Sequence, residues 1–273
     1  MFEKYEKLNK IGEGAFGLVY KGQNKLTKET VSIKEIPIKR FEGMDIDIRA
    51  ETQKEIKFMQ IFNFCPNSVK LYDTYDENET LYLVMELCDT DISKCLEKSQ
   101  NGFSIYEVKI VMKQFNNILY EIRKRDMIHN DVKLENILIK FKNDSKEFEI
   151  KLMDYGQMKL LSSTKNLNNN EWGIKPYEDN KENLEIMEKV DLLNLGIDIY
   201  RMLFKDAYKS IEEMLDRIDK NIEDNDLKDL MHKLLVDIEY PSKRISWEDY
   251  FNHNFFKINK FDFDKIENII KKY

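Results

Sequence analysis

A glycine-rich segment near the start of the sequence has the spacing of a phosphate-binding loop. Gly12, Gly14 and Gly17, followed by Val19, match the pattern G-x-G-x-x-G-x-V, in which positions without side chains let backbone N–H groups approach phosphate oxygens. A plain turn and the similar motif of dinucleotide-binding folds are the alternatives. A dinucleotide motif should open a helix, whereas residues 18–20 continue as a strand, so the flanks favour a phosphate-binding turn between two strands.

A lysine and a glutamate further along could complete a phosphate site. Residues 31–34 predict a strand, whose side chains alternate between two faces, so that Lys34 can point toward the glycine-rich segment. Glu55, on a helix expected over residues 48–61, is the partner that would hold Lys34 against the α- and β-phosphates, and Glu51 one turn away is the alternative. An exposed lysine with surface glutamates would explain the same residues without any function.

The strongest pattern lies in the middle of the chain. His129, Asp131 and Asn136 have the spacing of a catalytic loop, and the triplet 154–156, Asp-Tyr-Gly, follows it. Through these residues the sequence resembles the eukaryotic protein kinase family, in which the two segments are the H-R-D loop and the D-F-G triplet. The resemblance covers roughly residues 4–257. It implies an α+β fold of two lobes, a small β-sheet lobe with one helix and a larger, mainly α-helical lobe.

The resemblance implies a role for each matching residue. Asp131 would orient the substrate hydroxyl and accept its proton, and Lys133 would neutralise charge on the transferred phosphoryl group. Asn136 and Asp154 carry the oxygen ligands that Mg²⁺ prefers, so the cofactors implied are ATP and Mg²⁺. Each Asp or Asn alone could be a turn or cap residue. Together with the lysine and the glutamate above, they occur in the order that the chemistry requires.

The family also implies where the adenine ring of ATP should bind. Met85 takes the gatekeeper position, and Glu86 and Cys88 resemble the hinge whose backbone groups bind the adenine edge. Asp91 stands where the family often has a carboxylate that binds the ribose, with an exposed charge as the alternative. Val19, Ser32 and Leu138 would sandwich the ring. The predicted nucleotide-binding residues are Ile11, Gly12, Gly14, Gly17, Val19, Ser32, Lys34, Met85, Glu86, Cys88, Asp91 and Leu138.

Three further positions resemble structural features of the family. Asp191 could cap a buried helix and accept N–H bonds from the catalytic loop, and Arg244 is placed to pair with Glu178. Asp198 lies in an otherwise apolar helix, where a buried carboxylate needs a partner or a raised pKa.

Other positions depart from the family pattern. Asn130 replaces the arginine that would clamp a phosphorylated activation loop, so activation through residues 162–164, Ser-Ser-Thr, is not expected. Residues 176–178, Pro-Tyr-Glu, are a poor copy of A-P-E, and Glu171 stands near the place of a threonine that helps to bind the peptide. These changes place the docking of a peptide in question.

The function that these residues favour is ATP-dependent transfer of the γ-phosphate to Ser or Thr hydroxyls of protein substrates, with Lys133 indicating Ser/Thr rather than Tyr. An ATP-binding pseudokinase or scaffold is the alternative. A small-molecule kinase is a further alternative, because His-Asn-Asp at residues 129–131 also resembles the aminoglycoside and choline kinases. Glu135 and Asp91 could recognise basic residues near the phosphorylation site.

The elements that must position these residues follow from the periodicity of the sequence. Short β-like runs dominate the first part of the chain and helical periods dominate the second part. Strands are expected at 18–20, 30–33, 68–71, 81–85, 137–139 and 148–152, and helices at 48–61, 105–125, 190–204 and 210–219. We expect one kinase domain over residues 1–273, divided into a small lobe (1–87), a large lobe (88–257) and a tail (258–273).

Composition limits the remaining classes of function. The 273 residues suit one catalytic unit, and 42% hydrophobic residues suit a folded chain. A net charge of −7 argues against broad binding to nucleic acid or to anionic membranes. The three cysteines lack metal-ligand spacing, and no apolar run approaches the roughly 18 residues of a membrane span. We therefore expect an intracellular protein in the cytoplasm, with the nucleus as an open alternative.

Overall fold

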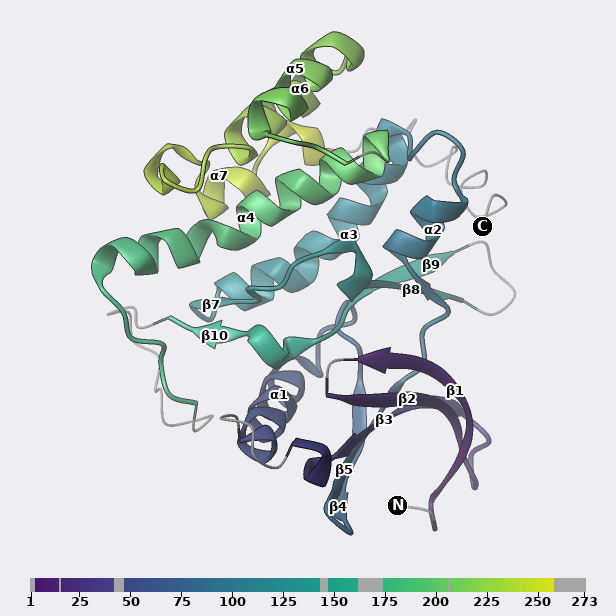
Figure 1. The fold of residues 1–273 in the computed structure, drawn as a ribbon. Coiled ribbons are helices and arrows are strands. Elements are labelled where there is room, and N and C mark those ends of the chain that lie inside the picture. Colours follow the sequence, from purple (N-terminus) through teal and green to yellow (C-terminus); the bar gives the residue numbers. More distant parts are fainter. Residues whose placement is uncertain are drawn as a thin grey trace.

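The computed structural model describes residues 3–14, 16–41, 47–142, 147–161, 174–205 and 207–257. The first part of the chain forms an antiparallel sheet with the strand order β1-β2-β3-β5-β4, and one helix lies against it (Figure 1). These elements are β1 (Tyr5–Gly14), β2 (Gly17–Asn24), β3 (Thr30–Pro37), β4 (Leu71–Glu77), β5 (Thr80–Glu86) and α1 (Ile48–Phe62), with a short 3-10 turn at Ile38–Phe41.

The alternation of side chains along β3 separates the two faces of this sheet. Val31 and Ile33 join a small apolar cluster with Tyr5 and Val84, whereas Ile36, on the opposite face, belongs to the main core. Because side chains alternate along a strand, the face that holds Ile36 also carries Lys34. The sequence prediction for this strand is therefore confirmed.

Most of the second part of the chain is helical and lies on the other side of the catalytic loop from the sheet (Figure 1). Its helices are α2 (Ile92–Lys98), α3 (Ile105–Arg123), α4 (Lys181–Phe204), α5 (Ile211–Asn221), α6 (Asn225–Leu234) and α7 (Trp247–Phe251). Short 3-10 turns occur at Pro241–Lys243 and Asn254–Phe256. The predicted α+β class, with a β-sheet portion followed by a helical portion, is confirmed.

Short strands and turns carry residues 129–136 and 154–156, and all of them except β6, which precedes α2, lie between α2 and α4. Two small antiparallel sheets form there, one of β6, β8 and β9 and one of β7 and β10. The elements are β6 (Thr90–Asp91), β7 (Met127–Ile128), β8 (Ile137–Phe141), β9 (Phe148–Leu152) and β10 (Lys159–Leu160), with 3-10 turns η2 (Leu134–Asn136) and η3 (Tyr155–Gln157).

Two sequence predictions of secondary structure are wrong. Residues 68–70 are not part of a strand, because β4 begins at Leu71 and Val69 N donates to Leu152 O of β9 at 3.0 Å. Helix α4 begins at Lys181 rather than at 190, with Asn180 as its N-cap. Its first turns are exposed or half-buried and carry charged residues between Leu184, Met187 and Val190, so their apolar period is weaker than that of the later turns.

Aromatic packing joins the two parts of the chain. Tyr155 is fully buried, stacks on Phe62 of α1 at 5.9 Å between ring centroids, and meets the His129 ring edge-on at 5.7 Å. The Tyr155 hydroxyl lies 2.7 Å from Ser68 Oγ, so its one polar atom is satisfied. The position of α1 is therefore coupled to the segment that carries Asp154 and to the catalytic loop.

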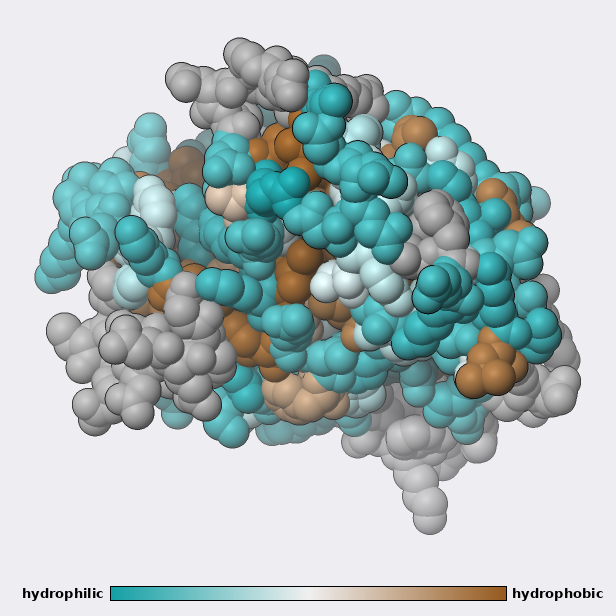
Figure 2. All heavy atoms as spheres, turned by 90° about the horizontal axis from the view of Figure 1, so that it is seen from below, coloured by the Kyte–Doolittle hydropathy of each residue, from teal (hydrophilic) through white to brown (hydrophobic). Residues whose placement is uncertain are grey.

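Seen from below, the molecular surface is largely hydrophilic, with apolar side chains mainly in small groups (Figure 2). In the described ranges, no helix has both the length and the apolar character of a membrane span. The predicted tail, 258–273, lies outside the described residues. The division of the chain at residues 87 and 88 stays a prediction.

Candidate active site

Lys34 and Glu55 form an ion pair between the sheet and α1. Lys34 Nζ lies 2.8 Å from Glu55 Oε1 and 2.9 Å from Oε2, and the two side chains are only 16% and 8% exposed. Glu51 instead lies 3.7 Å from the exposed Lys54. The alternative interpretation, that Lys34 and Glu55 are exposed surface charges, is therefore wrong. An ammonium group has three donors, so Lys34 keeps one of them for a further acceptor.

The glycine-rich segment forms the tight end of the β1–β2 hairpin. Gly12 pairs with Val19, and Gly14 pairs with Gly17, so the chain continues as a strand rather than opening a helix. A Cβ at Gly17 would lie 2.1 Å from Glu35 O, which only a glycine avoids. At Gly12 and Gly14 a Cβ would meet nothing closer than 3.7 Å. A side chain at these two positions would therefore not clash with the protein itself, and their lack of one lets a ligand approach the backbone.

The catalytic loop alternates between solvent and core. Asp131, Lys133 and Glu135 reach solvent, whereas the residues between them are buried. Lys133 Nζ lies 2.6 Å from Asp131 Oδ2, and Asn136 Nδ2 donates to the same oxygen at 2.9 Å. Both contacts use Oδ2. They fix the carboxylate through one oxygen, and among the described residues no hydrogen bond is made to Asp131 Oδ1.

Asp191 on α4 holds the start of this loop. Its carboxylate accepts from the backbone N–H groups of His129 at 2.7 Å and Asn130 at 2.8 Å. Burial raises the pKa of Asp191, yet these two donors satisfy both of its oxygens. The predicted bonds to the catalytic loop are confirmed. The predicted cap is wrong, because Asp191 lies in the interior of α4 rather than at its start.

The asparagine at position 130 suits the backbone there. Asn130 has φ of 62°, and Asp154 has φ of 63°. This left-handed region is unfavourable for most residues but is tolerated by Asn and Asp. Local geometry therefore explains why a small polar residue fits at position 130.

Asn136 and Asp154 provide a pair of oxygen donors suited to Mg²⁺. The backbone N–H of Met153 donates to Asn136 O at 3.1 Å, which brings the two segments together. Asn136 uses both protons of Nδ2 on Asp131, leaving its Oδ1 for a cation. The described part of the chain contains no group of three or more His, Cys, Asp or Glu side chains that could hold a metal ion. Such a sparse donor set fits Mg²⁺, which commonly shares its coordination with substrate phosphates and water.

The predicted adenine residues lie at the end of β5 and on the strands that face it. Ser32 Oγ donates to Glu86 O at 3.2 Å, so one of the hinge carbonyls already accepts a hydrogen bond from the protein. Burial raises the pKa of the Cys88 thiol to about 12, which keeps it neutral. Asp91 is buried and accepts from Lys94 N at 2.9 Å as the N-cap of α2. Its interpretation as an exposed charge is wrong, and its ribose role stays a prediction.

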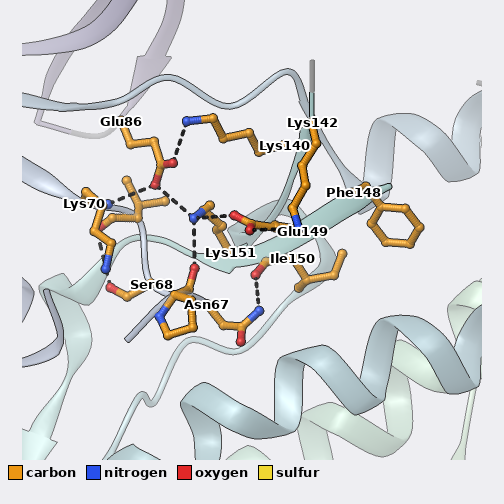
Figure 3. A network of polar contacts seen from close by, with 12 residues as sticks. Asn67, Ser68, Lys70, Glu86, Lys140, Lys142, Phe148, Glu149, Ile150 and Lys151 are labelled. Atoms are coloured by element: carbon orange, nitrogen blue, oxygen red, sulfur yellow. Dashed lines mark hydrogen bonds and ion pairs between the residues drawn. The ribbon is translucent and has the colours of Figure 1, made fainter. Parts of the chain in front are cut away.

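A buried network of charges fixes the side chain of Glu86 (Figure 3). Glu86 Oε1 lies 2.6 Å from Lys140 Nζ on β8, and Oε2 lies 3.2 Å from Lys151 Nζ on β9. Lys151 also reaches Glu149 at 3.0 Å and Pro66 O at 2.8 Å. Glu86 and Lys151 are only 6% and 3% exposed, so removing either one would leave a buried charge with fewer partners. Nothing in the sequence pattern indicated this network.

The predicted pair between Glu178 and Arg244 is wrong. Arg244 is buried and donates to main-chain carbonyls of Leu234, Lys189 and Val236, while Glu178 is exposed. The guanidinium therefore ties the end of α6 to α4 through backbone atoms. Every residue has a main-chain carbonyl, so the sequence does not indicate which of them will accept a hydrogen bond from Arg244.

Asp198 has the partner that its sequence environment requires. Its side chain is 3% exposed, and Arg201 Nη1 lies 3.4 Å from Oδ1. Burial raises the pKa of Asp198 to about 7, against the opposing effect of Arg201. Both expectations for this residue, a partner and a raised pKa, are confirmed. Residues 162–164 and Glu171, with the predictions made for them, lie outside the described residues.

The geometry above is that of a kinase fold, and the chain belongs to the protein kinase domain family, which matches residues 5–256. The serine/threonine-protein kinase atg1 of Dictyostelium discoideum is 30% identical over 270 residues, which cover 93% of this chain and 39% of that relative. Cyclin-dependent kinase-like 4 of Mus musculus is 37% identical over 161 residues, covering 58% and 44%. Cyclin-dependent kinase 9 of Danio rerio is 31% identical over 181 residues, covering 63% and 46%. The chain spans less than half the length of these curated relatives.

Replacing Lys151 by Met should destabilise the fold strongly, because it leaves two carboxylates without their buried partner. We expect a loss of about 3 kcal/mol in the free energy of unfolding, measured by urea denaturation. Lys140→Met is the matched control, since that side chain is 37% exposed and its loss should cost about 1 kcal/mol or less. Equal losses for the two variants would show that the buried network is not the source of the effect.

Replacing Asp198 by Asn should change how stability depends on pH. The folded protein binds the Asp198 proton more tightly than the unfolded chain, so this stabilisation is complete at low pH and is lost as pH rises through about 7. The Asp198→Asn variant lacks this titration. From about pH 5 to about pH 8 we therefore expect Asp198→Asn to gain about 3 kcal/mol relative to wild type in the free energy of unfolding.

The control for this experiment is Asp216→Asn, an exposed carboxylate on α5 that pairs with Lys220. Its difference from wild type should stay constant over the same pH range. A constant difference for Asp198→Asn as well would contradict the raised pKa. The charged groups that act on Asp198 are Arg201 and Glu135, and both keep their charge throughout this range.

Proposed function

We propose that the chain binds ATP with Mg²⁺ and transfers the γ-phosphate to Ser or Thr hydroxyls of protein substrates. The observation that carries the proposal is the arrangement around Asp131, whose carboxylate is fixed through Oδ2 by Lys133 and Asn136 and is free at Oδ1. A substrate hydroxyl that reaches Oδ1 would be oriented for attack and would have an acceptor for its proton.

Binding of ATP would depend on both parts of the chain. Lys34, held by Glu55, would contact the α- and β-phosphates with its remaining donor, under the hairpin of Gly12 and Gly14. Asn136 and Asp154 would hold Mg²⁺, which when bound neutralises charge on the phosphates. The adenine ring would lie between the half-buried side chains of β2 and β8, next to the end of β5.

The transfer step follows from these positions. The substrate hydroxyl oxygen forms a bond to the γ-phosphorus, the bond to the β,γ-bridging oxygen breaks, and ADP leaves. Asp131 takes the hydroxyl proton, and Lys133 faces the transferred phosphoryl with its positive charge. Lys133 lies between Asp131 and Asn136 as in Ser/Thr kinases, and two of the relatives named above are a serine/threonine-protein kinase and a cyclin-dependent kinase.

The pseudokinase alternative is weakened by the same residues. A pure scaffold has no need to hold Lys34 on Glu55 or to fix one oxygen of Asp131 while leaving the other free. We extend the proposal to the division of the chain, with residues 1–87 as the small lobe, 88–257 as the large lobe and 258–273 as a tail.

Two substitutions test the proposal in a radiolabelled phosphate-transfer assay with Mg²⁺-ATP and several protein substrates. Asp131→Asn removes the proton acceptor and should lower the rate about a thousandfold. Lys34→Met removes the phosphate contact and should lower it at least about a hundredfold. Lys7→Met is the matched control, because Lys7 also pairs with a glutamate of the same sheet, at 2.5 Å from Glu35, outside the proposed site.

The result that separates the alternatives is the activity of wild type against Asp131→Asn. If a folded wild-type protein transfers no more phosphate than this variant, and Mg²⁺-ATP still raises its melting temperature, the protein is a nucleotide-binding scaffold. Transfer to choline or to an aminoglycoside without transfer to protein would favour the small-molecule alternative.

A further inference from the structure

The catalytic loop carries a carboxylate that the proposed transfer step does not use. Glu135 is exposed and lies four residues along the same loop from Asp131, and Asp131 and Lys133 also reach solvent. A substrate that offers a hydroxyl to Asp131 would therefore pass close to this part of the loop. An extended chain advances about 3.3 Å per residue, so substrate residues within about four positions of the hydroxyl pass near Glu135.

A free carboxylate at this place would favour basic substrate side chains, but Glu135 is already paired. Arg201 Nη2 from α4 lies 2.8 Å from Glu135 Oε1, and Ser93 Oγ from α2 donates to the same oxygen at 3.3 Å. The chain thus supplies its own cation to this carboxylate.

Arg201 is held from its other side as well. Its Nη1 lies 3.4 Å from the buried Asp198, whose Oδ2 has no hydrogen-bond partner among the described residues. A basic substrate side chain that displaced Arg201 from Glu135 would also weaken the contact that compensates a buried carboxylate. Removing one partner from such a pair is strongly unfavourable. Exchanging Arg201 for a substrate cation at Glu135 is therefore energetically unfavourable.

We propose that Arg201 is a specificity-determining residue, which occupies Glu135 and so prevents the active site from selecting substrates with Arg or Lys beside the phosphorylated hydroxyl. The substrate class is then Ser/Thr segments without a required basic residue near the hydroxyl. This inference rests on the proposed function. It replaces the expectation from the sequence that Glu135 recognises basic residues.

The test compares peptides that differ only in an Arg or an Ala at each position within four residues of one serine. For wild type, the ratio of kcat/KM between the Arg and Ala peptides should stay near one at every position. For Arg201→Gln, which frees Glu135, the ratio should rise about tenfold at one or two positions, through a lower KM for the Arg peptide. The double variant Arg201→Gln/Glu135→Gln should return the ratio to near one.

Lys220→Gln is the control, because it removes one positive charge from the exposed surface of α5 and should leave the ratio unchanged. Circular dichroism and the melting temperature establish that each variant is folded. Should Arg201→Gln be unfolded, Glu135→Gln alone decides, since it should leave the wild-type ratio near one. A strong preference of wild type for Arg peptides, lost in Glu135→Gln, would overturn the inference.

Binding of the same peptides separates this inference from the proposed function. Fluorescence anisotropy with labelled Arg and Ala peptides gives the ratio of dissociation constants without any phosphate transfer. A ratio that rises in Arg201→Gln while no variant transfers phosphate would support the role of Arg201 and contradict the catalytic proposal. An unchanged ratio in Arg201→Gln, in both binding and transfer, would overturn the inference while leaving catalysis intact.

Discussion

The buried carboxylate of Asp191 is the interaction on which the active site depends. By accepting the backbone N–H groups of His129 and Asn130, it fixes the start of the catalytic loop to the interior of α4. The loop then alternates between core and solvent, and this alternation brings Asp131 to the surface in a single orientation. An exposed carboxylate would hold the two amides less firmly, because water would compete for them. The helix that supports the loop also carries Arg201, so the proposed proton acceptor and the proposed specificity-determining residue are both positioned by α4.

The residues of the candidate site were accessible to sequence reasoning because they depend on short-range spacing. The intervals within 129–136 and 154–156 place the side chains on one loop and one turn, whatever surrounds them. The helix of residues 48–61 was predicted closely, since its apolar face faces the core and Asp47 caps its start. The structure was needed only to decide between the predicted partner of Lys34, Glu55, and the alternative, Glu51. The two glutamates are one turn apart, and the direction of α1 decides between them.

What the sequence could not predict are contacts with long-range or main-chain partners. Arg244 resembles a residue that pairs with a glutamate, but it meets backbone carbonyls, which every residue possesses. The half-buried first turns of α4 have only a weak apolar period, and the segment at 68–70 follows its contact with β9 rather than local periodicity. The network of Glu86, Lys140 and Lys151 joins residues more than fifty positions apart, so no local pattern marks it.

That network also has a mechanical consequence for the hinge. Glu86 is the last residue of β5 and belongs covalently to the sheet, yet its side chain is tied to β8 and β9 in the other part of the chain (Figure 3). Any rotation of the sheet relative to the helices must therefore bend the backbone on either side of this anchor, rather than at the anchor itself. The anchored residue, Glu86, also provides the main-chain carbonyl that accepts a hydrogen bond from Ser32. The backbone edge that would contact the adenine ring is thus positioned by the same buried charges.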